Sequence, residues 1–130
     1  MADSRDVWAT VTVPVALVEE AVTANQRLHW SERGKRTAAL RRKSKILHRG
    51  VDPMRTAALV VTVQWPDRRR RDVANLAPTI KALVDGAVDC GVLPDDDDSH
   101  LVGPDMRTSP HTSGSAGVAV LAMHWHGIPL

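Results

Sequence analysis

Residues 56–65 read TAALVVTVQW, and residues 66–91 continue as PDRRRRDVANLAPTIKALVDGAVDCG. The first stretch is β-branched and apolar with no glycine or proline inside it, which predicts a central strand covered on both faces. The second stretch carries apolar residues at the spacing of one helical stripe: Ile80, Leu83, Val84, Ala87 and Val88. Pro78 suits the first turn of this helix, and Gly91 suits the position just past its end.

Shorter patterns on either side predict the remaining strands. Residues 7–13 alternate apolar and polar side chains, and residues 117–125 do so more loosely, as strands do. Residues 100–102 predict a short strand, and the Ser-, Gly- and Pro-rich residues 108–117 predict a loop. The expected fold is therefore a single α/β (α+β) domain over residues 1–130, with two main helices on a small mixed β-sheet.

A polar helix is expected between the first two strands. It would begin at Ser31, a good N-cap, and end near His48, with Gly50 closing it. Its apolar stripe is thin: Ala38, Leu40 or Ala39, Ile46 and Leu47. Basic side chains occupy more than one of its faces, which fits either a solvated surface helix or a helix that contacts phosphates.

The composition excludes several classes of protein. The chain has 130 residues and a mass of 14.2 kDa, which suits one domain. The single cysteine, Cys90, excludes an intrachain disulfide framework and fits a reducing cytoplasm. The sequence shows neither a signal peptide nor an apolar run long enough to span a membrane. The absence of Phe and Tyr excludes a stacked aromatic platform of the RNA-recognition type.

The net charge of +2 hides an uneven distribution. Residues 27–55 hold ten Lys or Arg against Glu32 and Asp52, a charge of +8. Residues 82–106 hold seven Asp and no Lys or Arg, a charge of −7. A basic surface attracts a polyanion, and an acidic cluster tolerates one when a metal ion neutralises it. The distribution suggests metal-dependent chemistry on nucleic acid.

The segment from residue 66 to residue 96 carries chemically distinctive residues in a fixed order. They are the basic run Arg68–Arg71, then Asp72, Asn75, Lys81, Asp85, Gly91 and the pair Asp95-Asp96. This order resembles the RusA family of Holliday junction resolvases, bacterial and phage endonucleases that cut four-way DNA junctions. The likeness covers roughly residues 60–106.

The resemblance implies a Mg²⁺-dependent endodeoxyribonuclease, with Mn²⁺ as a substitute, that resolves branched DNA by paired nicking. The implied catalytic residues are Asp72, Lys81, Asp85 and Asp96, and the implied metal ligands are Asp72, Asp85, Asp95 and Asp96. The implied DNA-binding residues are Arg68, Arg69, Arg70, Arg71, Asn75, Arg41, Arg42 and Lys45. Carboxylates suit this chemistry because a metal ion that they hold activates water and compensates phosphate charge. The resemblance implies a homodimer, since paired nicking needs two equivalent sites related by a two-fold axis. It also implies the cytoplasm of a bacterial cell as the location, and no membrane partner is expected.

Two positions depart from the family pattern. Ala74 stands where the family has a second aspartate, so one metal ligand is missing. Asn75 and Lys81 are six positions apart instead of three, and Pro78 in the insertion suggests an added turn before the helix. The loss of a carboxylate leaves a non-catalytic junction-binding or DNA-binding protein as the alternative. A plain nucleic-acid-binding regulator would leave the acidic residues without a role.

A few other residues have ordinary structural interpretations. Trp65 and Trp125 end apolar strands and are expected in or beside the core. Trp30 is expected to pack, with contact to an unstacked base as the alternative. His124 and His126 share one strand face and are expected to be a surface pair, since no second pair of zinc ligands accompanies them. Cys90 is expected to pack near the end of its helix.

Overall fold

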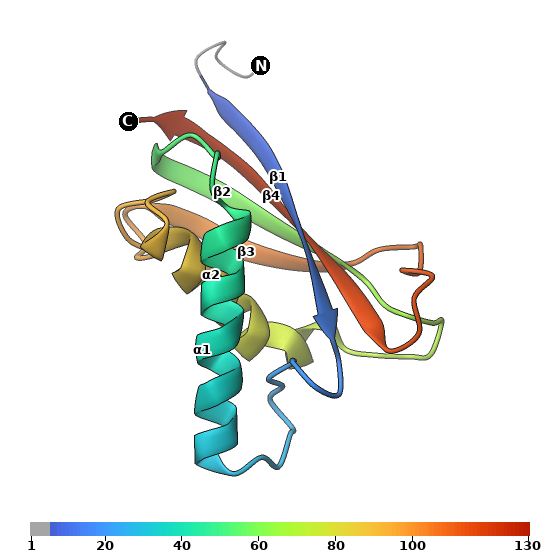
Figure 1. Cartoon of the computed structure of the whole chain (residues 1–130). Helices are drawn as coiled ribbons and strands as arrows, with labels where there is room; N and C mark the ends of the chain where they lie inside the picture. The colour runs from blue at the N-terminus through green and yellow to red at the C-terminus, as the bar shows by residue number, and fades with distance from the viewer. Residues whose placement is uncertain (1–5) are drawn as a thin grey trace.

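A computed structural model describes residues 6–130 of the chain (Figure 1). The elements follow in the order β1 (Val7–Ala16), α1 (Trp30–Leu47), β2 (Met54–Gln64), the 3-10 turn η1 (Val73–Leu76), α2 (Ala77–Asp89), β3 (Leu101–Thr108) and β4 (Val118–Pro129). The expected α+β domain with a mixed sheet and two helices is confirmed. Within residues 6–130, no helix has both the length and the apolar character that a membrane crossing requires.

The sheet has the strand order β1-β4-β2-β3. The last strand, β4, lies between β1 and β2 and pairs antiparallel with both, so that Leu121 is opposite Val13 on one side and Val63 on the other. β2 pairs parallel with β3, and α2 makes the connection between them. The sheet is therefore mixed, and β1 and β3 form its edges.

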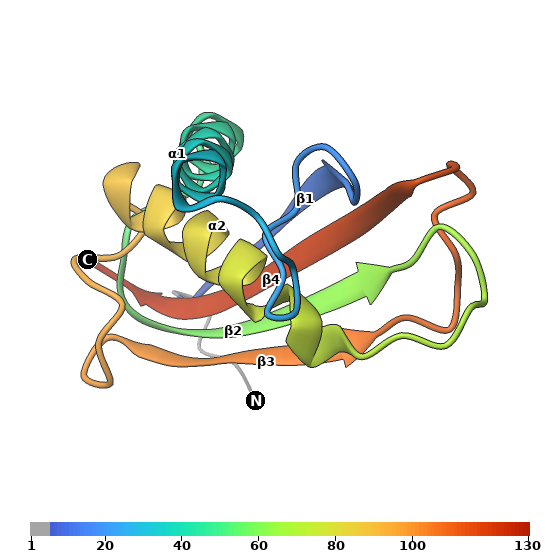
Figure 2. The ribbon, with the colours of Figure 1, turned by 90° about the horizontal axis from the view of Figure 1, so that it is seen from below.

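Both helices lie on one face of the sheet, α2 against the strands and α1 beside α2 (Figure 2). Alternate residues of β2, namely Ala57, Leu59, Val61 and Val63, are buried beneath them. Ala58 on the opposite face is exposed, and Val60 and Thr62 are only half-buried. The prediction that β2 is covered on both faces was wrong, because the two helices pack against each other and leave the second face uncovered.

The packing of α1 differs from the expected apolar stripe. The side chains that it buries are Leu40, Ser44 and, just past its end, His48, whereas Ile46 and Leu47 are exposed. The Ser44 hydroxyl donates a hydrogen bond to the carbonyl oxygen of Leu83 in α2. Gly86 permits this close approach, because a Cβ there would lie 2.6 Å from Ser44 Cβ. The helix therefore packs through small and polar groups with satisfied hydrogen bonds.

His48 and Trp125 form a polar contact inside the core. Both side chains are fully buried, and the Trp125 Nε1–H donates to His48 Nε2 over 3.0 Å. His48 Nδ1 lies 2.9 Å from the carbonyl oxygen of Ser44, so the imidazole is neutral with its proton on Nδ1. Burial lowers the pKa of His48 below its ordinary value. Trp65 is also buried, which confirms both tryptophan predictions.

The strand expected over residues 100–102 is much longer, since β3 continues to Thr108. The sequence hides this strand because Gly103 and Pro104 interrupt it. Gly103 has φ 101°, and a Cβ there would lie 2.6 Å from the carbonyl oxygen of Leu59. The parallel register with β2 shifts at this point, between Ala58 and Val60. An irregular edge strand of this kind discourages further strand pairing.

Candidate functional site

The turn before α2 positions the start of the candidate site. Asp72 is the N-cap of η1, and its carboxylate accepts a hydrogen bond from the Ala74 N–H over 3.0 Å. Pro78 occupies the first turn of α2. The added turn expected from the insertion before Lys81 stays a prediction, because Pro78 of the insertion lies in α2 itself. η1 instead consists of residues 73–76, which include Ala74 and Asn75, and leads the chain into α2.

Lys81 lies between two carboxylates. Its Nζ is 2.9 Å from Asp85 Oδ1, one helical turn away, and it also contacts Asp96 Oδ2 in the turn after α2. The lysine side chain is 60% exposed, while the side chains of Asp85 and Asp96 are 27% and 26% exposed. Lys81, Asp85 and Asp96, called here the Lys81 cluster, are therefore brought together as the resemblance implies and remain open to solvent.

Lys81 and Asp96 each stabilise the charged form of the other. Hydrogen bonds to Asp96 and then to Asp85 raise the pKa of Lys81 above its ordinary value. The hydrogen bond from Lys81 lowers the pKa of Asp96. At neutral pH Lys81 is therefore an ammonium and Asp96 a carboxylate. In this state Lys81 carries a positive charge and Asp96 a negative one.

The other two expected metal ligands, Asp72 and Asp95, form no ion pair with Lys81 among the described residues. Asp95 Oδ1 accepts from the backbone N–H of Asp96 over 2.7 Å, so Asp95 fixes the acidic turn. Asp72 forms no hydrogen bond or ion pair with the Lys81 cluster in the described chain. Over residues 6–130, no three His, Cys, Asp or Glu side chains form a group that could hold a metal ion. The full set of four ligands stays a prediction from resemblance.

A cavity of about 340 Å³ opens beside the Lys81 cluster. It lies between α2 and β3, with Ile80, Val84 and Met106 among its apolar walls. Lys81 and Asp96 also line it, so the charged groups border an apolar groove.

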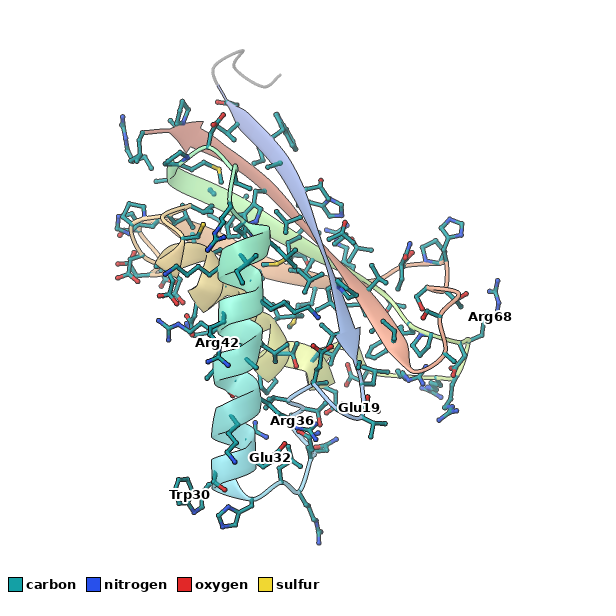
Figure 3. The ribbon with its side chains drawn as sticks, in the orientation of Figure 1. Glu19, Trp30, Glu32, Arg36, Arg42 and Arg68 are labelled. Atoms are coloured by element: carbon teal, nitrogen blue, oxygen red, sulfur yellow. The ribbon has the colours of Figure 1, made fainter. Side chains whose placement is uncertain are left out.

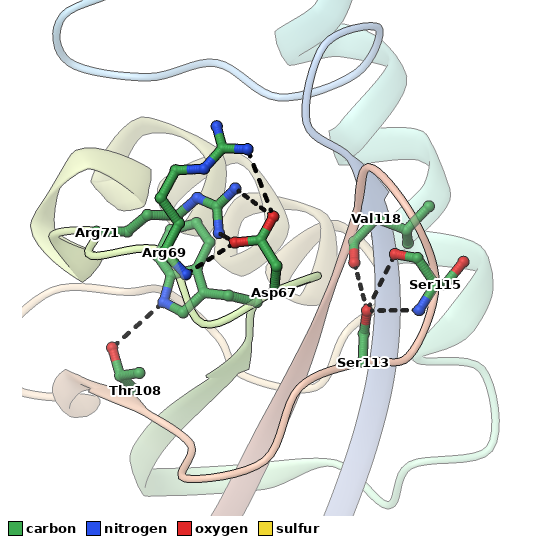
Figure 4. A network of polar contacts seen from close by, with 8 residues as sticks. Asp67, Arg69, Arg71, Thr108, Ser113, Ser115 and Val118 are labelled. Carbon is green, nitrogen blue, oxygen red and sulfur yellow. Dashed lines mark hydrogen bonds and ion pairs between the residues drawn. The ribbon is translucent and has the colours of Figure 1, made fainter.

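The arginine run lies at the opposite end of the sheet from the acidic turn. It follows the end of β2, whereas the acidic turn leads into the start of β3, and these two strands run parallel. Arg71 donates to Asp67 over 2.6 Å and lies 5.3 Å from the Trp65 ring, and the backbone N–H of Arg69 also bonds Asp67 (Figure 4). The arginine run and Asp96 therefore lie at opposite ends of the sheet, and the DNA-binding role of the run stays a prediction.

The arginine run also contains two side chains, called here free cations, that have no ion-pair partner among the described residues. Arg68 and Arg70 form no ion pair in the described part of the chain, and Arg68 projects from the loop, far from α1 (Figure 3). Asp67 was missed as a partner of Arg71, although their spacing of four residues was a visible signal. Hydrogen bonds from Arg71 and then from the Arg69 backbone lower the pKa of Asp67.

The basic side chains of α1 also include both a cation held in an ion pair and exposed cations. Arg41 donates to Asp89 of α2, with Nη2–Oδ1 at 2.8 Å, which raises the pKa of Arg41 and lowers that of Asp89. Arg42 (Figure 3) and Lys45 are exposed. Asn75 uses its backbone, accepting from the Ala24 N–H and donating to the Asp72 carbonyl oxygen, each over 3.0 Å. Sequence reasoning missed Asp89 because its partner is 48 positions away.

The remaining sequence predictions are met in part. His124 and His126 do share one face of β4, where they bond Thr10 and Asp6. Cys90 is partly buried against the core, as expected. Trp30, expected to pack, is instead 79% exposed.

The sequence matches no protein-family model. It matches no curated protein either. Solved structures with some similarity include the hydrogenase maturation protein HypE of E. coli, at 11% identity and a TM-score of 0.31 over 94% of this chain and 32% of that one. A second HypE structure gives 8% identity and a TM-score of 0.30 over 100% of this chain and 34% of that one. The chain thus spans about a third of the length of these structures.

Proposed function

We propose that this protein is a metal-dependent endodeoxyribonuclease that cuts four-way and other branched DNA, as the RusA-like residue pattern implies. The observation that carries the proposal is the Lys81 cluster. Three residues that the resemblance singles out, separated by up to 15 positions, meet at one exposed point with their charges intact. A purely structural ion pair would need only one of the two carboxylates.

The donor set of the Lys81 cluster fits Mg²⁺. This ion takes one or two protein carboxylates and keeps several of its waters, so Asp85 and Asp96 are sufficient as ligands. When bound, Mg²⁺ or Mn²⁺ would supply charge compensation and a water of lowered pKa. Lys81 would bind a non-bridging oxygen of the scissile phosphate and stabilise the added charge of the transition state. Asp72 and Asp95 would contribute only after a local rearrangement.

The DNA surface of the proposal uses the free cations. Arg42 and Lys45 on α1 and Arg68 and Arg70 after β2 are exposed. Arg42 and Arg68 project from two separate regions of the molecule (Figure 3). Paired cations such as Arg41 and Arg71 would mainly maintain the fold. Two separated basic regions suit a branched substrate, whose arms diverge from one point.

Paired nicking would require a second copy of the chain. We place that copy on the uncovered face of the sheet, where Trp8 and Val102 are 66% and 71% exposed. The Trp8 ring stacks on His126 with the centroids 3.7 Å apart, which gives this face a fixed aromatic surface. A symmetric contact there would relate the two Lys81 clusters by a two-fold axis.

A non-catalytic junction-binding protein is the second candidate. Ala74 and the lack of a three-member ligand group in residues 6–130 favour it. The two candidates differ in one assay, which mixes the protein with a labelled synthetic four-way junction and with linear duplex, with and without Mg²⁺. Junction cleavage supports the enzyme, and selective junction binding that never yields cut strands supports the binder.

Arg42 is expected to contribute one phosphate contact. Arg42→Ala should weaken binding to all DNA sequences alike and reduce the slope of log Kd against log salt by about one, because one fewer counterion is released. Titrations at several salt concentrations measure this slope. Arg107→Ala is the matched control, since Asp105 already holds that guanidinium at 2.7 Å, and its slope should equal that of the unmodified protein. An unchanged slope for Arg42→Ala would remove α1 from the DNA surface.

A further inference from the structure

We propose that Trp30, at the start of α1, stacks on an unpaired nucleobase of the DNA. The inference rests on the proposed function and names the feature of branched DNA that α1 would recognise. Trp30 is the first residue of the helix and is 79% exposed, which makes it the most exposed large apolar side chain of the described residues (Figure 3). An aromatic ring this open to water gains from any flat partner that covers it.

The backbone beneath Trp30 is firmly held. Arg36 donates to the carbonyl oxygens of Val18 and Ala21 over 2.8 and 3.1 Å. Arg33 donates to the carbonyl oxygen of Thr23 over 3.1 Å. These bonds tie the first turns of α1 to the preceding loop. The ring is therefore presented from a rigid base, and ordering it on a partner costs little conformational entropy.

His29 supports the ring from the other side of the helix start. Its Nδ1 accepts from the Ser31 N–H over 3.2 Å, which fixes the imidazole as the N-cap. The His29 and Trp30 rings are tilted by 35° with their centroids 5.4 Å apart. Two neighbouring aromatic rings that lie outside the core form a small stacking surface.

The exposed cations along this segment of the chain favour a nucleic acid as the occupant. Arg27 and Lys35 are exposed on either side of Trp30 in the sequence, and farther along α1 lies the free cation Arg42. Aromatic rings among cations bind single strands by stacking on bases while the cations follow the backbone. Bases inside an intact duplex are stacked on each other and offer no free face. Trp30 would therefore act where strands part, as they do at a junction.

The test compares affinity for a single-stranded oligonucleotide with affinity for a duplex of the same length, at several salt concentrations. Trp30→Leu should weaken single-strand binding about tenfold, since stacking contributes on the order of a factor of ten or more per base. Duplex affinity and the salt slope should stay unchanged, because no phosphate contact is lost. Trp30→Phe, which keeps an aromatic ring, should recover most of the single-strand affinity.

Ile46→Ala is the matched control. Ile46 is 55% exposed on the same helix, so this variant removes apolar surface without removing a ring, and its affinities should equal those of the unmodified protein. Equal single-strand affinity for Trp30→Leu and the unmodified protein would overturn the stacking role while leaving the nuclease proposal in place. If the unmodified protein binds neither DNA, both proposals fail together.

Discussion

Asp96→Asn is expected to reduce metal-dependent cleavage of a four-way junction by about a hundred- to a thousandfold, the loss typical of one group that stabilises a charged transition state. The substitution keeps the size of the side chain and removes its negative charge. Asp96 is the partner with the largest effect on the Lys81 pKa, so its loss also leaves Lys81 held by Asp85 alone. Initial cleavage rates at saturating Mg²⁺ measure the effect.

Asp98→Asn is the control for this prediction. It makes the same chemical change two positions along the acidic turn, at an exposed side chain outside the Lys81 cluster. Its cleavage rate should stay within about twofold of the unmodified rate, since surface substitutions of this kind perturb little. Junction binding by Asp96→Asn should be kept, because removing a negative charge does not repel DNA. Full activity in Asp96→Asn would exclude the Lys81 cluster as the catalytic site.

Trp125→Ala is expected to lower the free energy of unfolding by about 3–5 kcal/mol, the usual cost of removing a fully buried tryptophan. The variant loses the packing of β4 against the helices and the hydrogen bond to His48. A domain of this size has only about 5–15 kcal/mol to lose, so the urea midpoint should fall steeply. Trp125→Phe keeps an aromatic ring but loses the N–H donor and part of the packed indole volume, and should cost about 1–3 kcal/mol.

The His48 contact gives the same experiment a pH readout. Burial lowers the His48 pKa, so between that value and its ordinary value near 6.5 the unfolded chain binds a proton that the folded chain does not. Stability in this window therefore rises with pH and falls as pH decreases. Trp125→Ala opens the site to water and should flatten this dependence. Trp30→Ala, at an exposed ring, should change neither stability nor its pH dependence, and equal losses in the two variants would contradict the core assignment.

The periodicity of apolar residues in the sequence was sufficient to predict most of the strands and helices of the fold. The alternation in β1 and the helical stripe from Ile80 to Val88 identify elements whose faces differ in polarity, and the structure confirms both. The full length of β3 was not predicted, because Gly103 and Pro104 break its sequence pattern. Its pairing with β2 also depends on a strand that is distant in the sequence. The N-cap of α1 was predicted two residues too late, at Ser31, because His29 is an unusual cap whose side chain accepts a hydrogen bond from the Ser31 N–H.

The site was predictable where contacts are local or where the resemblance supplied them. Lys81 and Asp85 are one helical turn apart, so their contact follows from spacing alone. The approach of Asp96 depends on how the chain turns after α2, which no local pattern specifies. The pairing of Arg41 with Asp89 depends on the packing of two helices. The exposure of Trp30 likewise follows from tertiary structure, because α1 extends beyond the elements that could have covered it.

The most direct test of the central claim is a cleavage assay on a labelled four-way junction with the purified, unmodified chain. With Mg²⁺ or Mn²⁺, the Lys81 cluster is expected to produce nicks in two opposed strands, whereas EDTA or a linear duplex of the same sequence should give none. Paired, metal-dependent nicks would support both the carboxylate site and its two-fold arrangement. Junction binding that never leads to cut strands at any Mg²⁺ or Mn²⁺ concentration would contradict the enzyme and leave the junction-binding protein.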